Sequence, residues 1–180
     1  FCVGALVFWL VGFALMFGGS KLTPGLSSGN QFVGYSGFLL LGNSYDVSTA
    51  MLWMFQIMFA ATACTIVTGA VAERFKFHAY VLYSVFLCGV LYPIFGHWMW
   101  GKGWLEMLPF GVGARDFAGS GVVHGIGGLI AFVAAWMTGP RYGKYNPDGS
   151  SNVIHGHNLL YIVMGTLILI FGWFGFNAGS

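Results

Sequence analysis

Residues 47 to 72 read VSTAMLWMFQIMFAATACTIVTGAVA and contain no charged side chain. Roughly 20 apolar residues in a helix cross the hydrocarbon core of a membrane, so this run is long enough to span it. Three further runs, at 77 to 101, 117 to 140 and 149 to 180, are also free of charge. A lipid-exposed backbone must satisfy its own hydrogen bonds, and the polar alternation of barrel strands is missing. The sequence therefore predicts an all-α, polytopic transmembrane helix bundle.

The overall composition supports the same class. Only 7% of residues are charged while 57% are hydrophobic and 18% are aromatic, which excludes an ordinary water-soluble domain. The basic residues are spread over loops, so the chain lacks the basic stripe of a nucleic-acid-binding protein. Its three cysteines form no CxxC pair, and His155 and His157 have no third ligand nearby in the sequence. We expect no nucleic-acid partner, no metal, no cofactor and no enzymatic activity.

We expect one transmembrane domain over residues 1 to 180, with helices at about 1 to 17, 51 to 72, 77 to 98, 117 to 138 and 157 to 179. The first of these reaches only about 25 Å at ~1.5 Å per residue, which is short of a ~30 Å hydrocarbon core. The chain also lacks an initiating Met and stops inside a hydrophobic run. We therefore expect it to be an internal fragment of a longer protein.

The distribution of basic residues predicts how the helices are oriented. The short connection at 73 to 76 and the loop at 139 to 156 lie on one face of the membrane and contain Arg74, Lys76, Arg141 and Lys144. The longer loops on the other face contain Lys21, Lys102 and Arg115. The positive-inside rule favours the first face as cytoplasmic. We therefore expect a multi-pass protein of the cell membrane, with Asp116 and Ser180 toward the outside.

Two ionisable residues mark one membrane segment as a candidate site. Residues 116 to 124 read DFAGSGVVH, in which Asp116 opens the segment and His124 lies about 12 Å deeper at the usual helical rise. Ionisable groups inside membrane helices are candidates for function. The alternatives are structural: Asp116 at the helix start caps free backbone N–H groups, and His124 bridges two helices. His97, near a helix end, is expected at the membrane interface.

Aromatic and small polar side chains share faces on two helices. Spacings of three and four residues bring side chains together on a helix, and they occur in two sets: Phe55, Gln56 and Phe59, and Trp173, Phe176 and Ser180. Trp100 lies at the outer end of the third helix. Such aromatic stripes also occur on packed or lipid-facing surfaces, and a single Trp there is typical of an interfacial belt. A pore lining and plain packing both remain open on these spacings alone.

Taken together, the motifs resemble those of a known family. Residues 116 to 124 and the run GWFGFNAGS at 172 to 180 are similar to the signatures of the ammonium transporter family (Amt/Mep/Rh). Residues 55 to 59, 69 to 74 and 97 to 101 resemble further parts of that family in the same order. The resemblance implies part of an eleven-helix, inverted-repeat fold, here running from about the second helix to the sixth. It also implies a homotrimer in which each subunit has its own pore.

The resemblance further implies roles for particular residues. Trp100 and Ser180 would form an outer ammonium site, and Phe59 and Phe176 a stacked phenyl gate. His124 would be one of two pore histidines. Pore-lining roles follow for three more residues, and an electrostatic and structural role for a fourth: Phe55, Gln56, Trp173 and Asp116. Ammonium and ammonia, with methylammonium as an analogue, would be the transported solutes, and a cytosolic regulatory protein is a further partner.

The energetics of dehydration favour a particular mechanism. Moving an ammonium-sized ion into a low dielectric costs on the order of 20 kcal/mol by idealised estimates, with several remaining after relaxation. A cation over an aromatic face gains only about 0.5 to 2 kcal/mol. We therefore expect ammonium to be recruited at Trp100 and deprotonated, so that ammonia passes the gate. Two alternatives remain: an ammonium sensor on the same fold, and a membrane haem-binding electron-transfer protein with His97 and His124 as axial ligands.

Overall fold

The computed structural model describes all residues from 1 to 180, and the expected all-α fold is confirmed. The chain has no β-strand, only two isolated β-bridges. The helical segments are α1 (Cys2–Val7), α2 (Phe13–Phe17), α3 (Val47–Val71), α4 (Phe77–Phe86), α5 (Tyr92–Trp100), α6 (Ile126–Thr138) and α7 (Leu159–Trp173). π-helical turns at Phe8–Gly12 and Leu87–Leu91 join α1 to α2 and α4 to α5. Two more, Ser120–Gly125 and Phe174–Ala178, precede α6 and follow α7.

Four continuous helical segments are long and apolar enough to cross a membrane. They are Val47–Val71, Phe77–Trp100, Ser120–Thr138 and Leu159–Ala178, while Cys2–Phe17 is apolar but shorter. Short 3₁₀ turns at Phe38–Leu40 and Gly42–Ser44 interrupt the loop before α3.

The helix boundaries differ from the expected ones where a capping residue decides them. Helix α3 begins at Val47 rather than 51, because the Asp46 carboxylate accepts a 3.0 Å hydrogen bond from Thr49 N–H. The hydrogen bonds from the Thr49 hydroxyl and N–H also lower the pKa of Asp46. The segment expected from 117 becomes helical only at Ser120, since Gly119 has a φ of 95° and turns the chain.

The core lies where the α1–α2 run packs against α4 and α5 and against α3. Its fully buried side chains are mostly aromatic or aliphatic, including Phe8, Phe13, Phe17 and Tyr92. Helices α3 and α6 also pack closely. A Cβ added to Gly127 would lie 3.0 Å from the Ala63 carbonyl oxygen, so the glycine permits this approach. The compact part of the chain is therefore a packed group of helices around α3 from its middle to its C-terminal end.

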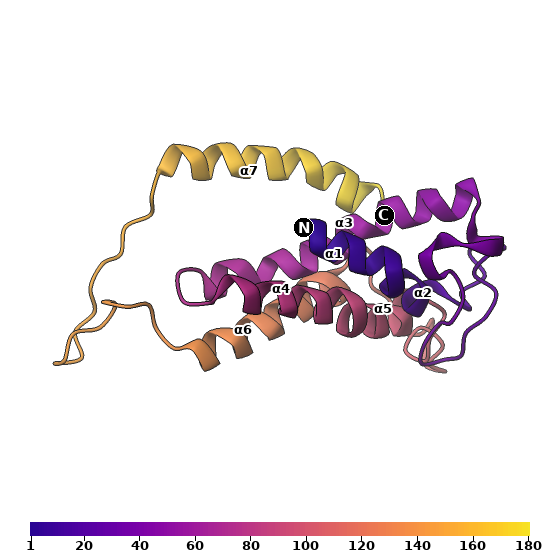
Figure 1. Ribbon diagram of the computed structural model, residues 1–180, viewed down its shortest axis with the longest axis horizontal. Helices are drawn as coiled ribbons and strands as arrows, with labels where there is room; N and C mark the ends of the chain where they lie inside the picture. The colour runs from indigo at the N-terminus through magenta and orange to yellow at the C-terminus, as the bar shows by residue number, and fades with distance from the viewer.

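Helix α7 lies apart from this group, as Figure 1 shows in yellow along the top of the molecule. A long loop carries the chain from the end of α6 to the start of α7, and every residue of α7 is exposed. Contact with the packed helices occurs after α7, where the half-buried Phe176 packs against the core. The last turn of the chain thus brings distant sequence segments together.

Candidate functional site

A cavity of about 230 Å³ gathers most of the candidate residues. Six of them line it, from α3, the end of α5, the loop before Ser120 and the last residue of the chain: Phe55, Gln56, Phe59, Trp100, Asp116 and Ser180. Its wall is completed by Phe17, Leu22, Leu52 and Phe117. The fold thus brings together residues that are more than 100 positions apart in the sequence. The result is a small, largely aromatic chamber with a few polar atoms.

Two phenyl rings stack beside this cavity. The ring centroids of Phe59 and Phe176 lie 4.0 Å apart with an interplanar angle of 22°. The Phe55 ring lies 4.9 Å from that of Phe59. Phe59 is 1% exposed, so its position is set by the core rather than by solvent. The stacked pair therefore joins the wall of the cavity, through Phe59, to the last turn of the chain.

Hydrogen bonding and ring packing orient Trp100. Its indole N–H donates a 2.7 Å hydrogen bond to the backbone carbonyl of Asp116. Its ring meets that of Phe59 edge to face, at 5.8 Å and 87°. Because the only polar atom of the indole is already paired, the side chain offers its π surface to the cavity. A π surface attracts a cation.

The Asp116 carboxylate is occupied by donors from the following turn. Its Oδ1 accepts from the N–H groups of Gly119 and Ser120, both at 2.8 Å, and from the Ser120 hydroxyl at 3.1 Å. Its Oδ2 accepts from the N–H groups of Gly121 and Val122 at 2.8 and 2.7 Å. Burial raises the pKa of Asp116, but these hydrogen bonds outweigh it and hold the pKa below its ordinary value.

The expected position of Asp116 at the helix start was wrong by several residues. Gly119 is the N-cap residue, and Asp116 reaches the free N–H groups from outside the helix. This is possible because the left-handed backbone of Gly119 folds the segment back over the first turn. The carboxylate thereby spans four successive backbone donors rather than the one or two of an ordinary cap.

His124 adjoins the stacked phenyl pair rather than the cavity. Its ring lies 6.2 Å from that of Phe176, nearly perpendicular at 88°. Its Nδ1 lies 3.4 Å from the Gly119 carbonyl oxygen, and the side chain is exposed within this chain. A succession of contacts therefore leads from the cavity to Phe59, then to Phe176, then to His124.

Two polar side chains offer acceptors to the cavity. The Gln56 side chain is 8% exposed, and its Oε1 has no hydrogen-bond donor in the protein. An unpaired buried acceptor is costly, which makes this oxygen available to a donor in the cavity. The Ser180 hydroxyl donates to the Phe176 carbonyl, leaving its own lone pairs free to accept.

Sequence reasoning and structure differ at a few positions. Trp173 is 41% exposed and does not line the cavity. Leu52 does line it and continues the helical stripe of Phe55, Gln56 and Phe59, so the spacing of three and four already contained its signal. Phe17 is the last residue of α2 and Leu22 lies in the loop that follows, and no pattern in the sequence marks them as neighbours of α3.

The structure places His97 inside the protein, and its expected position at the depth of the membrane interface stays a prediction. His97 is fully buried, and each of its ring nitrogens lies 2.7 Å from a backbone carbonyl oxygen, of Met16 and Asn30 respectively. The ring therefore ties α5 to the end of α2 and to the following loop. No nitrogen is left over for a ligand, and no group of three or more His, Cys, Asp or Glu side chains is placed to hold a metal ion.

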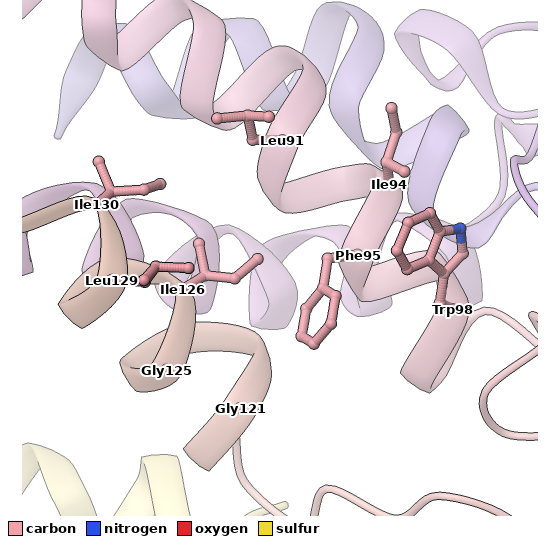
Figure 2. A pocket seen from close by; sticks show the side chains of 9 residues that line it. All are labelled: Leu91, Ile94, Phe95, Trp98, Gly121, Gly125, Ile126, Leu129 and Ile130. Carbon is pink, nitrogen blue, oxygen red and sulfur yellow. The ribbon is translucent and has the colours of Figure 1, made fainter. Parts of the chain in front are cut away.

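A larger cavity of about 510 Å³ lies between α5 and α6 and differs in chemistry. Figure 2 shows its lining, which consists of aliphatic and aromatic side chains and two glycines: Leu91, Ile94, Phe95, Trp98, Gly121, Gly125, Ile126, Leu129 and Ile130. The one polar atom among these side chains is the Trp98 indole N–H, which donates to the Phe32 carbonyl. This groove has nothing to bind a small polar solute.

Comparison with known proteins gives a consistent result. The family model described as Ammonium Transporter Family matches residues 1–180. The chain is 54% identical to "Ammonium transporter Amt2" of Archaeoglobus fulgidus, covering 100% of this chain and 38% of the relative. It is 44% identical to "Ammonium transporter 1 member 3" of Solanum lycopersicum, with 99% and 38% covered. The chain thus spans well under half the length of these relatives.

Comparison with solved structures gives the same result. A "Sensor Amt Protein" has 45% sequence identity and a TM-score of 0.82, with 99% of this chain and 43% of that chain covered. Mep2 of Candida albicans has 31% identity and a TM-score of 0.78, with 99% and 38% covered.

Proposed function

Because the chain belongs to the ammonium transporter family, we propose that it contributes the outer binding site, the gate and part of the pore to a protein that transports ammonium. It is a multi-pass membrane protein, with four helices able to cross the membrane. The observation that carries the proposal is the order of contacts: an aromatic cavity, then the stacked Phe59–Phe176 pair, then His124. This order fits the transport of a small cation that loses its proton, rather than an enzymatic reaction.

Recruitment takes place in the cavity. The π surface of Trp100 attracts the cation, while the unpaired Gln56 Oε1 and the lone pairs of Ser180 accept hydrogen bonds from its N–H groups. A hydrogen bond from a charged donor contributes about 1.5 to 3 kcal/mol. These gains suffice to hold ammonium at the mouth but not to offset its full dehydration, which costs several kcal/mol or more.

Ammonium then releases its proton, which stays behind with water at the mouth of the cavity or travels separately along the pore histidines, and neutral ammonia passes between the phenyl rings. Phe59 and Phe176 provide no acceptor for a charged species, so the stacked pair favours the neutral form. Beyond it, His124 offers an imidazole with donor and acceptor capacity. Asp116 keeps the turn that carries His124 in place, because its carboxylate is saturated by backbone donors and is not free to bind ammonium.

The positions of the basic residues in the loops support one orientation of the helices across the membrane. With the connection at 73 to 76 and the loop at 139 to 156 in the cytoplasm, the cavity opens toward the outside of the cell membrane, with Asp116 and Ser180 at its mouth. Two further parts of this proposal rest on membership of the family: assembly as a homotrimer and regulation by a cytosolic protein.

An ammonium sensor is the second candidate function. One solved structure of high similarity is named a sensor, and a sensor would use the same cavity to bind ammonium. The haem-binding alternative is disfavoured by geometry, because both ring nitrogens of His97 already contact backbone carbonyls.

The proposal is tested with His124→Ala in the full-length protein. We expect this variant to lose methylammonium and ammonium uptake, since it removes the polar group that follows the gate. The protein should remain at a normal level in the membrane and assemble as the wild type does. Unchanged uptake at a normal membrane level would remove His124 from the pore. Ammonium binding without any uptake by the wild type would favour the sensor.

A further inference from the structure

A second polar cavity lies at the opposite end of α3 from the candidate site. It has a volume of about 330 Å³ and is lined by six residues: Arg74, Pro140, Arg141, Lys144, Tyr145 and Ile154. Arg74 follows the end of α3 and Pro140 follows the end of α6. Both helices are long enough to cross a membrane when their adjoining turns are included. The cavity therefore lies where two membrane-spanning segments end. The C-terminal ends of α3 and α6 lie toward the left in Figure 1.

Arg74 contributes its charge and one remaining donor, the buried Nε, which has no hydrogen-bond partner within the protein. Its two terminal amino groups donate to the carbonyls of Ala70 and Gly139, at the ends of α3 and α6. Helix C-termini are partly negative and would repel an anion. Because the guanidinium caps these carbonyls, it offsets that repulsion on one side of the cavity.

Arg141 and Lys144 supply donors that are not used up within the protein. The Arg141 Nε lies 3.4 Å from the Glu73 carboxylate, and the rest of its guanidinium has no protein acceptor. The Lys144 ammonium donates to the Asn152 carbonyl at 3.1 Å and lies 6.0 Å from the centre of the Tyr145 ring. Of the three cations that line the cavity, only Arg141 is paired with a carboxylate, which leaves the cavity positively charged.

The arrangement differs from that of solvated loop charges. Arg74, Arg141 and Lys144 are all half-buried and converge on one hollow, whereas the neighbouring Lys76 is exposed and does not line it. Half-burying a cation is costly unless it gains a partner. Within the protein their partners are backbone carbonyls and the Glu73 carboxylate, so net positive charge remains, and its convergence on one cavity points to an anion as a further partner.

We propose that this cavity binds a phosphate group, as carried by the headgroup of an anionic phospholipid. Arg presents several donors in a plane and Lys a mobile point charge, and both are common ligands of phosphate oxygens. Basic residues directly beside a membrane helix attract anionic lipids. Pro140 and Ile154 add an apolar wall next to the charges, which suits a headgroup whose acyl chains continue along the helices.

Binding is measured with the full-length protein in neutral detergent after its native lipid has been removed. The probe is dioctanoyl phosphatidylglycerol, with dioctanoyl phosphatidylcholine as the zwitterionic control. Each basic side chain near an anionic headgroup contributes about fivefold in affinity. We therefore expect the double variant Arg141→Gln, Lys144→Gln to bind phosphatidylglycerol about 25-fold more weakly. The matched variant Lys76→Gln, on the same face but outside the cavity, should change binding by less than about twofold.

A variant that is expected to bind more tightly keeps the proposal testable even if the double variant misfolds. Glu73→Gln removes the carboxylate that competes for Arg141 while keeping every cation, so it should tighten binding about fivefold. Inorganic phosphate as a competitor distinguishes the two sources: displacement of the lipid at millimolar phosphate supports a free phosphate ligand, and lack of displacement supports the headgroup. Equal affinity for phosphatidylcholine, or Glu73→Gln without tighter binding, would overturn the proposal. None of these measurements depends on ammonium transport.

Discussion

The recruiting role proposed for Trp100 leads to a quantitative prediction. Trp100→Leu removes a cation–π contact of about 1 kcal/mol, which corresponds to roughly a fivefold rise in the ammonium concentration that gives half-maximal uptake. The maximal rate should fall less, because Phe59, Phe176 and His124 are unchanged.

The same substitution also removes the 2.7 Å hydrogen bond to the Asp116 carbonyl. This loss affects the empty and the occupied site alike, so it lowers stability by about 1 kcal/mol without changing affinity. Trp100→Phe separates the two effects, since it keeps an aromatic face and lacks the N–H donor. We expect Trp100→Phe to have a half-saturation within about twofold of the wild type but a thermal stability as low as that of Trp100→Leu.

The assay is initial uptake of labelled methylammonium over a range of concentrations, corrected for the amount of protein in the membrane. An unchanged half-saturation in Trp100→Leu would refute the reasoning, because the indole would then serve only as a packing element. An equal rise in Trp100→Phe and Trp100→Leu would show that the hydrogen bond, rather than the aromatic face, carries the effect.

Three further predictions follow from the contacts. Asp116→Asn should keep part of the uptake, because one acceptor oxygen still serves two of the N–H donors, whereas Asp116→Ala should lose nearly all; equal loss at normal protein levels would show that the charge itself is required. The pKa of Asp116 is lower in the folded protein than in the unfolded chain, so the ionised carboxylate stabilises the fold fully above the unfolded pKa of about 3.9. This stabilisation is lost as the pH falls through the folded pKa. The thermal stability of the wild type should therefore fall in that pH range, and that of Asp116→Asn should lack this pH-dependent part. Gly127→Val should destabilise the packed helices by about 1 to 3 kcal/mol, because its Cβ would lie 2.9 Å from the Ile66 side chain, while Gly128→Val, with open space around it, should have little effect in thermal unfolding.

Much of the architecture could be predicted from local sequence alone. The lengths of the uncharged runs predicted helices rather than strands, because a lipid-exposed backbone must be paired within its own segment. Boundaries were less predictable: Asp46 extends α3 by capping it, and the positive φ of Gly119 delays the helix that carries His124. Such effects depend on the conformation of one or two residues, which hydrophobic patterning does not register.

The candidate site shows the same difference between what local sequence predicts and what tertiary packing decides. The sequence by itself determined which side chains were available: the stripe of Phe55, Gln56 and Phe59 on one helix, and the imidazole of His124 in a membrane segment. Only the tertiary structure decided which of them meet. The stacking of Phe59 on Phe176 joins residues 117 positions apart, and the two carbonyls around His97 join it to α2 and to a loop. Local spacing specifies the face of one helix, whereas contacts between helices depend on how whole segments pack, and that is a property of the assembled chain.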